Sequence, residues 1–232
     1  MEAVNHKLMI EQVATALGPE MLQQMAFVGG CTTALLLTDE FSIEQVRHTD
    51  DVDLIVHLMG RAEWPNFREK ILARGFREAI NDNPICSFML GALRVDFMPD
   101  DGLILGFTNR WYSEALESAI SYQLDQEITI RLVSPPYFIA TKLEAFAGRG
   151  TEGALGSRDI EDIITLIDGR ESLQEELSLA SPELKAYISE KLAQLLQDRD
   201  FEFAVSGNAQ NEEREALIFE RIEKIIKLKG SI

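Results

Sequence analysis

The sequence predicts an α+β fold, a small mixed sheet flanked by helices and followed by an all-helical half. Short apolar runs bounded by glycine, proline or aspartate occur only before Pro136, and the residues after it show a helical apolar period. Of the 232 residues, 46% are hydrophobic, which is enough for one sizeable core or a core with a smaller companion. We therefore expect one domain at residues 1–135 and a helical domain at residues 136–232.

The first part of the chain alternates helices and strands. Apolar residues at helical spacing predict a helix over residues 5–17, and MAFVGG at residues 25–30 is typical of a short strand that ends in two glycines. Residues 31–40 contain neither glycine nor proline and predict a helix, and residues 52–58 predict a buried strand. A Gly-Gly turn is thus expected between a strand and a helix.

One more helix and three more strands complete the mixed half. Residues 64–76 carry an amphipathic helical pattern, and Gly75 is expected to cap its C-terminus. Residues 85–90 and 93–98 are two strand patterns separated by a glycine, which predicts a hairpin. Residues 128–136 predict a last strand, which two prolines stop.

The second half predicts four helices. They cover residues 136–150, 157–170, 181–198 and 211–230. Ser157 and Ser181 are the expected N-caps, and Pro182 suits the first helical position. The last helix is acidic at its start and basic at its end, as the helix dipole favours.

Composition limits the possible partners. The formal net charge of −17 repels phosphate backbones and anionic lipids, so general coating of nucleic acids or membranes is not expected, whereas divalent cations are attracted. The N-terminus is too polar for a signal peptide, and no apolar run approaches about 18 residues, which predicts a cytoplasmic protein. Cys31 and Cys86 stand among apolar residues and are expected to be small buried side chains.

Three aspartates in four positions open one of the predicted strands. Because strand side chains alternate faces, Asp51 and Asp53 point to one side, about 7 Å apart, and Asp50 points to the other. In LRVDFMP, Asp96 likewise projects from the face opposite its buried neighbours. If the two strands are neighbours, the carboxylates converge, and their mutual repulsion and hard oxygen atoms favour Mg²⁺ between them.

The Gly-Gly turn supplies the other half of a reaction site. A strand, two glycines and a helix start present bare backbone N–H groups to an anion. Gly29 and Gly30 permit close approach because neither has a Cβ atom. A phosphate cradle beside metal-binding carboxylates is the apparatus of phosphoryl or nucleotidyl transfer.

These motifs and their order resemble the DNA polymerase β-type nucleotidyltransferase superfamily. VGG is followed by RHTDDVDLIV and then by RVDFMP, and the form Arg-x-Thr-x-Asp-x-Asp resembles the AbiEii-type nucleotidyltransferase toxins. In the helical half, IATKLEAFAGRG and SRDIEDIITLI resemble the Lys-x-x-Ala and Arg-Asp-x-x-Asp signature of that subgroup. The resemblance implies a nucleotidyltransferase core whose site is closed by the helical domain.

The resemblance also implies a role for each motif residue. Asp51, Asp53 and Asp96 would hold one or two Mg²⁺ ions, and Asp96 would help to deprotonate the attacking hydroxyl. The implied nucleotide-binding residues are Gly29, Gly30, Thr32, Thr33, Arg47, Thr49 and Lys142. Lys142 would contact a phosphate as a point charge, and Asp159 would orient Lys142, the acceptor or a metal-bound water.

The implied reaction transfers a nucleoside monophosphate from an NTP to a hydroxyl and releases pyrophosphate. The toxin-like relatives imply a tRNA end as the acceptor and a possible antitoxin partner, whereas the net charge of −17 favours a cationic small molecule such as an aminoglycoside. A protein side chain is a third acceptor class. A non-catalytic NTP-binding module and a structural helical adaptor are the alternatives outside this chemistry.

One spacing departs from the family pattern, and the last aspartate of the signature has an expectation of its own. The separation of Gly30 from Asp51 along the chain is longer than in compact members of the family. The insert TDEFSIEQV between them is expected to be a surface loop over the site or to alter substrate choice. Asp162, one turn beyond Asp159, is expected to pair with Arg158 or to face solvent.

Overall fold

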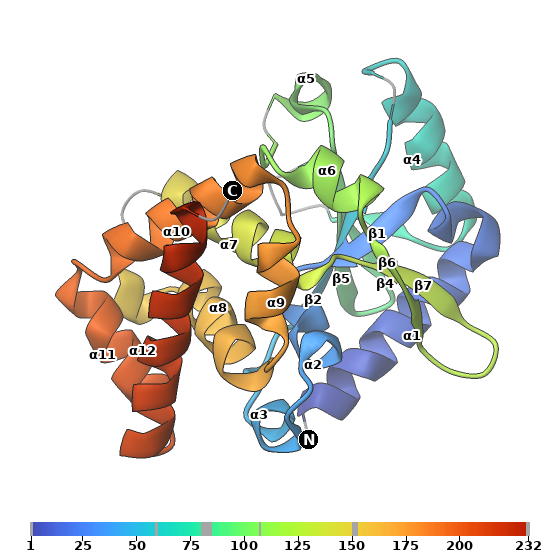
Figure 1. The fold of residues 1–232 in the computed structure, drawn as a ribbon. Helices are drawn as coiled ribbons and strands as arrows, with labels where there is room; N and C mark the ends of the chain where they lie inside the picture. The colour runs from blue at the N-terminus through green and yellow to red at the C-terminus, as the bar shows by residue number, and fades with distance from the viewer. Residues whose placement is uncertain (1, 59, 80–84, 107, 150–152, 231–232) are drawn as a thin grey trace. The chain divides into compact units, whose positions relative to one another are not determined.

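The chain forms two compact units in a computed structural model, shown in Figure 1. The described residues are 2–58, 60–79, 85–106, 108–149 and 153–230. The sheet unit comprises Met1–Leu35 and His48–Ser134, and the helical unit comprises Leu36–Arg47 and Pro135–Ile232. Residues Leu36–Arg47 thus belong to the helical unit although they lie between the first and second strands of the chain. The domains expected at residues 1–135 and 136–232 stay a prediction.

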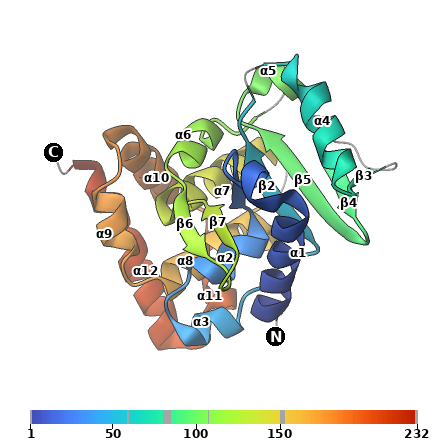
Figure 2. The same ribbon diagram turned by 90° about the vertical axis from the view of Figure 1, so that its right-hand side faces the viewer.

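The sheet unit is built on one mixed sheet, much of which Figure 2 shows. Its described residues form seven strands. In chain order they are β1 (Met25–Val28), β2 (Asp51–Val56), β3 (Arg77–Glu78), β4 (Ser87–Leu90), β5 (Leu93–Pro99), β6 (Ile120–Gln123) and β7 (Thr129–Leu132). Their spatial order is β3-β4-β5-β2-β1-β7-β6. β2 runs parallel to β5 and antiparallel to β1, and β1 runs parallel to β7. The predicted α+β class is therefore confirmed.

Helices accompany the strands of this unit. They are α1 (Glu2–Leu22), η1 (Gly30–Thr32), α2 (Thr33–Leu36), α4 (Glu63–Ala73), α5 (Gly102–Leu105) and α6 (Tyr112–Glu117). The first predicted helix is longer than expected and is kinked at Gly18, just before Pro19. The helix expected over residues 31–40 is shorter, because the amides of Thr38 and Asp39 bond to the carbonyl of Gly169 in the helical unit instead of to the preceding turn.

An aromatic cluster fills one face of the sheet under α4. The rings of Phe67 and Phe76 each meet Phe97 of β5 edge-on at 5.5 Å between centroids, and Phe88 of β4 meets it at 5.6 Å. Because side chains alternate along a strand, this packing directs Asp96 of β5 to the opposite face. The apolar face holds β5 in register and leaves the other face to polar residues.

Two predicted turns are confirmed in the sheet unit. Gly75 has a positive φ of 89° and its amide bonds to the carbonyl of Leu72, so it ends α4 as a left-handed cap. Leu90 and Leu93 pair across the β4–β5 hairpin, and Gly91 in the turn has a φ of 64°. Both positions use a backbone conformation that L-residues rarely adopt.

The helical unit contains the predicted helices and several short ones. Its elements are α3 (Glu40–Glu44), α7 (Pro135–Arg149), η2 (Ala154–Gly156), α8 (Arg158–Gly169), α9 (Leu173–Ser178), α10 (Pro182–Leu195), α11 (Arg199–Asn208), α12 (Glu212–Lys227) and η3 (Leu228–Gly230). The Ser157 and Ser181 side chains accept from Ile160 N and Leu184 N, which confirms both N-caps. None of the helices in the described part of the chain has the length and apolar character needed to cross a bilayer.

An arginine of α12 holds the early segment Leu36–Arg47 within this unit. Arg214 Nη2 lies 2.7 Å from Asp39 Oδ2 and 2.7 Å from Asp168 Oδ2, and it donates to Ser42 Oγ at 2.8 Å. The insert expected to be a loop thus carries the short helix α3, anchored by charge-assisted hydrogen bonds.

Both cysteines are buried free thiols, as predicted. Burial raises the pKa of Cys86 to about 12, and the charge of Asp96 adds to the effect. Because the thiolate is the reactive form, we expect neither thiol to react with a disulfide reagent at pH 8 in the native protein. Both thiols should react in guanidinium, and rapid labelling of Cys86 without denaturant would contradict the buried packing.

Candidate functional site

Three carboxylates converge on one face of the sheet unit. Asp51 and Asp53 stand at the N-terminal end of β2, with the buried Val52 between them. In the parallel register of β2 and β5, Asp53 is the partner of Asp96, so the two side chains leave the sheet on the same side. One carboxylate oxygen from each aspartate lies within 4.8 Å of the other two. The predicted adjacency of the two strands is therefore confirmed.

This donor set fits a hard divalent cation. Like charges held this closely repel one another unless positive charge lies among them. Carboxylate oxygens are the ligands that Mg²⁺ prefers, and these three would hold such an ion between them. Asp51, Asp53 and Asp96 thus suit Mg²⁺ by charge, atom type and spacing.

Thr49 lies behind the first of these carboxylates. Its Oγ1 donates to Asp51 Oδ1 at 2.6 Å, and its backbone N–H donates to His6 Nε2 of α1 at 3.3 Å. The side chain is buried. The structure therefore shows Thr49 orienting Asp51, while a direct contact of Thr49 with nucleotide stays a prediction.

The Gly-Gly turn lies against the second carboxylate. Val28 pairs with Asp53 across β1 and β2, so Gly29, the next residue, passes beside the Asp53 side chain. Gly29 has a φ of +80°, and a Cβ atom added to it would lie 1.9 Å from Asp53 Oδ2. Thr32 Oγ1 donates to the carbonyl of Gly29 at 2.8 Å, whereas the buried Thr33 hydroxyl has no hydrogen-bond partner among the described residues. The Gly-Gly turn therefore packs directly against the group of three carboxylates.

A buried ion-pair cluster occupies the helical unit. Lys142 Nζ of α7 lies 3.1 Å from Asp159 Oδ1 and 2.7 Å from Asp162 Oδ2, both on α8. Arg47 holds Asp162 with two hydrogen bonds of 2.9 Å, from Nε to Oδ1 and from Nη2 to Oδ2. Arg149 Nη1 lies 3.3 Å from Asp159 Oδ2. These three cations and two carboxylates carry one formal positive charge in excess.

The cluster corrects one interpretation of the sequence. Asp162 does not pair with Arg158 or face solvent, because its side chain is 1% exposed and its oxygens meet Arg47 and Lys142. Asp159 and Asp162 are three residues apart on α8 and so share a helix face. That spacing could have indicated that Asp162 faces Lys142 together with Asp159. The burial of Asp162 also depends on Arg47, which is remote in sequence.

The predicted site residues therefore divide between the two units. Those in the sheet unit are Gly29, Gly30, Thr32, Thr33, Thr49, Asp51, Asp53 and Asp96. Those in the helical unit are Arg47, Lys142 and Asp159. In the helical unit these residues gather around Lys142. In the sheet unit Thr49 and Gly29 lie against the carboxylates, and Thr32 bonds to the carbonyl of Gly29.

Comparison with known proteins decides the family. The family model described as nucleotidyl transferase AbiEii toxin, type IV TA system, matches residues 19–225. The chain belongs to the AbiEii family. The match spans every predicted site residue from Gly29 to Asp159, so the AbiEii chain is an enzyme of the nucleotidyltransferase class.

Two solved structures from Helicobacter pylori are similar to the AbiEii chain. JHP933 is 14% identical with a TM-score of 0.47, and the alignment covers 98% of this chain and 91% of that one. The second is a candidate nucleotidyltransferase, 11% identical with a TM-score of 0.44, and the alignment covers 98% of this chain and 96% of that one. No curated protein sequence matches the AbiEii chain.

Sequence reasoning missed Arg94, which lies beside the three carboxylates. Arg94 Nε donates to Asp96 Oδ1 at 3.1 Å, and Arg94 Nη2 donates to Asp96 Oδ2 at 2.9 Å. The sequence did contain a signal for Arg94, because residues that are two apart on a strand point to the same face.

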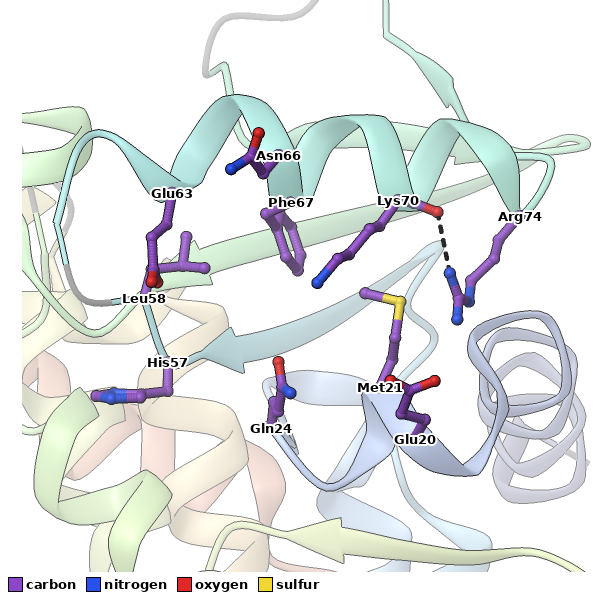
Figure 3. A pocket seen from close by; sticks show the side chains of 10 residues that line it. All are labelled: Glu20, Met21, Gln24, His57, Leu58, Glu63, Asn66, Phe67, Lys70 and Arg74. Carbon is purple, nitrogen blue, oxygen red and sulfur yellow. Dashed lines mark hydrogen bonds between the residues drawn. The ribbon is translucent and has the colours of Figure 1, made fainter.

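A separate cavity of about 370 Å³ lies beyond the other end of β2 (Figure 3). His57, just after β2, lines it together with Glu20 of α1, Glu63 and Lys70 of α4, and Arg74 just after α4. A hydrogen bond with Asp100 raises the pKa of His57. The mixed charges of this lining do not favour a triphosphate, and the lining residues include none of the predicted site residues of the AbiEii chain.

Replacing Asp162 by asparagine should destabilise the AbiEii chain by about 3–5 kcal/mol at pH 7, because Lys142 and Arg47 would stay buried beside one fewer anion. Burial alone would raise the pKa of Asp162, but the charge of Lys142 and the hydrogen bond from Arg47 outweigh it and hold that pKa below its ordinary value. Such a group stabilises the fold above its unfolded pKa, about 3.9, and loses that effect as pH falls through the folded pKa.

The difference between Asp162→Asn and wild type in urea unfolding should therefore be full at pH 7 and shrink below about pH 4. Glu202→Gln is the matched control, because it removes one exposed carboxylate from α11 and should change stability by no more than about 0.5 kcal/mol. Equal destabilisation by Asp162→Asn at pH 7 and pH 3 would contradict the ion-pair explanation.

Proposed function

We propose that this chain transfers a nucleoside monophosphate from a Mg²⁺-bound NTP to a hydroxyl group and releases pyrophosphate. The observation that carries the proposal is the convergence of Asp51, Asp53 and Asp96 in a chain of the AbiEii nucleotidyltransferase family. Bound Mg²⁺ would neutralise charge that develops on the reacting phosphate and would favour ionisation of the attacking hydroxyl.

The residues of the chain itself would bind and orient. Asp51, held by Thr49, and Asp53, beside Gly29, would hold the metal, and Asp96 would complete the site and help to accept the proton of the attacking hydroxyl. Most of the catalytic effect would come from positioning and from charge placed in advance.

The remaining motif residues belong to the same proposal. The backbone of Gly29 and Gly30, with Thr32 and Thr33 nearby, would approach the phosphates of the NTP. Arg47, Thr49 and Lys142 are the other proposed nucleotide contacts. The 3.1 Å ion pair between Lys142 and Asp159 supports an orienting role for Asp159.

We propose an RNA hydroxyl, such as a tRNA end, as the acceptor, with an antitoxin partner in the same system. The support is the description of the family as a toxin of a type IV TA system. A different observation favours a second acceptor class: the net charge of −17 would attract a cationic small molecule such as an aminoglycoside.

The deciding experiment incubates the protein with each α-³²P-labelled NTP, Mg²⁺ and total tRNA, with and without a panel of aminoglycosides. Label on RNA from one NTP would support the first acceptor and identify the base, and the transfer should weaken steeply with added salt. Label on an aminoglycoside would support the second acceptor. Without label, stabilisation by Mg²⁺-NTP would indicate a non-catalytic binding module, and the absence of both effects would refute the proposed function.

A further inference from the structure

Arg94 lies in the same row of side chains as the three carboxylates. It stands two residues before Asp96 on β5, so both side chains leave the sheet on one face. In the parallel register, Arg94 is the partner of Asp51, just as Asp96 is the partner of Asp53. The sheet therefore places one guanidinium and three carboxylates on four adjacent positions.

The guanidinium holds both oxygens of Asp96. The two hydrogen bonds, of 3.1 and 2.9 Å, form the paired geometry that fixes both the position and the plane of a carboxylate. Arg94 Nη2 also lies 3.3 Å from Ser87 Oγ on β4, and Ser87 is the antiparallel partner of Asp96. Asp96 is thus held by Arg94 of its own strand, and Arg94 is itself held by Ser87 of the neighbouring strand. This pair of hydrogen bonds from Arg94 to Asp96 is called the clamp below.

The formal charges give the clamp a second effect. The three carboxylates carry three negative charges and Arg94 carries one positive charge, so the group of four carries two negative charges, which one divalent cation cancels. Each carboxylate oxygen has two lone pairs, so the contacts of Arg94 leave Asp96 with acceptor capacity for a metal ion. Arg94 therefore reduces repulsion among the carboxylates without removing Asp96 as a ligand.

We propose that Arg94 is a positioning residue with two roles at this site. It keeps the Asp96 carboxylate in the orientation that the reaction requires, and its positive charge weakens the affinity of the three carboxylates for a divalent cation. The inference rests on the proposed function and names a residue that tunes it. Loss of the charge and loss of the paired geometry should therefore have different consequences.

The test measures Mn²⁺ affinity by the EPR signal of free Mn²⁺, together with Mg²⁺-dependent nucleotidyl transfer. Arg94→Gln removes the charge and the clamp, so it should bind Mn²⁺ about tenfold more tightly and turn over about 10–100-fold more slowly at saturating Mg²⁺. Arg94→Lys keeps the charge but loses the planar fork, so Mn²⁺ affinity should stay within about twofold while turnover falls about tenfold.

Arg77→Gln is the matched control, because it removes the same charge from an exposed position on the edge strand β3. Both its Mn²⁺ affinity and its turnover should equal those of wild type. Melting curves identify any variant that fails to fold, and Arg94→Lys then decides whether the paired geometry matters.

Tighter Mn²⁺ binding together with slower turnover in Arg94→Gln would support the inference. Unchanged affinity, weaker affinity or unchanged turnover in that variant would overturn it. If wild type binds Mn²⁺ no better than the double variant Asp51→Asn, Asp53→Asn, the metal site itself is wrong and the proposed function fails with it. That result differs from a failure of the Arg94 inference alone, in which wild type binds Mn²⁺ through its aspartates.

Discussion

Replacing Asp51 and Asp53 together by asparagine should lower nucleotidyl transfer at least about 10³-fold. Asparagine keeps the size of each side chain but removes two of the three negative charges that converge at the site. Metal stabilisation of charge in the transition state contributes several kcal/mol, and each 1.4 kcal/mol is about a tenfold change in rate. Initial rates of label transfer at saturating NTP and Mg²⁺ measure the effect.

Asp50→Asn is the control for this double variant. Asp50 is adjacent to Asp51 in sequence, and its replacement removes one negative charge, as each change in the double variant does. Its side chain is 89% exposed and does not belong to the group of three converging carboxylates. Its rate should stay near that of wild type. In addition, Mg²⁺ should raise the melting temperature of wild type and of Asp50→Asn but not that of the double variant. A double variant that transfers nucleotide at the wild-type rate would refute the metal mechanism.

The convergence of the carboxylates could be predicted only in part from the sequence. Strand alternation places Asp51 and Asp53 on one face, because it depends on local geometry alone. The position of Asp96 required the pairing of β2 with β5, which joins segments far apart in the chain. A strand pattern predicts that a strand exists but does not name its neighbour, so that step depended on the resemblance of the motifs.

The elements that sequence reasoning missed are short. β3, β6, α9 and α11 are examples. β3 and β6 are mostly exposed and form by pairing with β4 and β7, so no apolar pattern marks them in the sequence. The helix predicted to reach residue 40 ends early because Gly169 takes the amides of Thr38 and Asp39. Asp162 was expected to pair with Arg158 or to face solvent, because charged residues are usually exposed. Its burial depends on Arg47 and Lys142 as partners.

Replacing Gly29 by alanine should both destabilise the protein and disable the site. The positive φ of Gly29 costs an L-residue about 1–2 kcal/mol. The new Cβ atom would also lie 1.9 Å from Oδ2, 2.7 Å from Cγ and 2.9 Å from Cβ of Asp53, so the carboxylate must move. We expect the free energy of unfolding to fall by about 3 kcal/mol or more and the transfer rate to fall about 100-fold or more.

Gly75→Ala separates the two causes. Gly75 has a φ of +89°, close to that of Gly29, but a Cβ atom added there meets nothing within 4 Å. This control should lose only the backbone contribution of about 1–2 kcal/mol and keep the wild-type rate and Mn²⁺ affinity. Urea unfolding and transfer assays on both variants measure the difference. If Gly29→Ala matched Gly75→Ala in stability and kept its rate, Gly29 would serve the turn alone, and the close packing of the turn on Asp53 would have no part in the reaction.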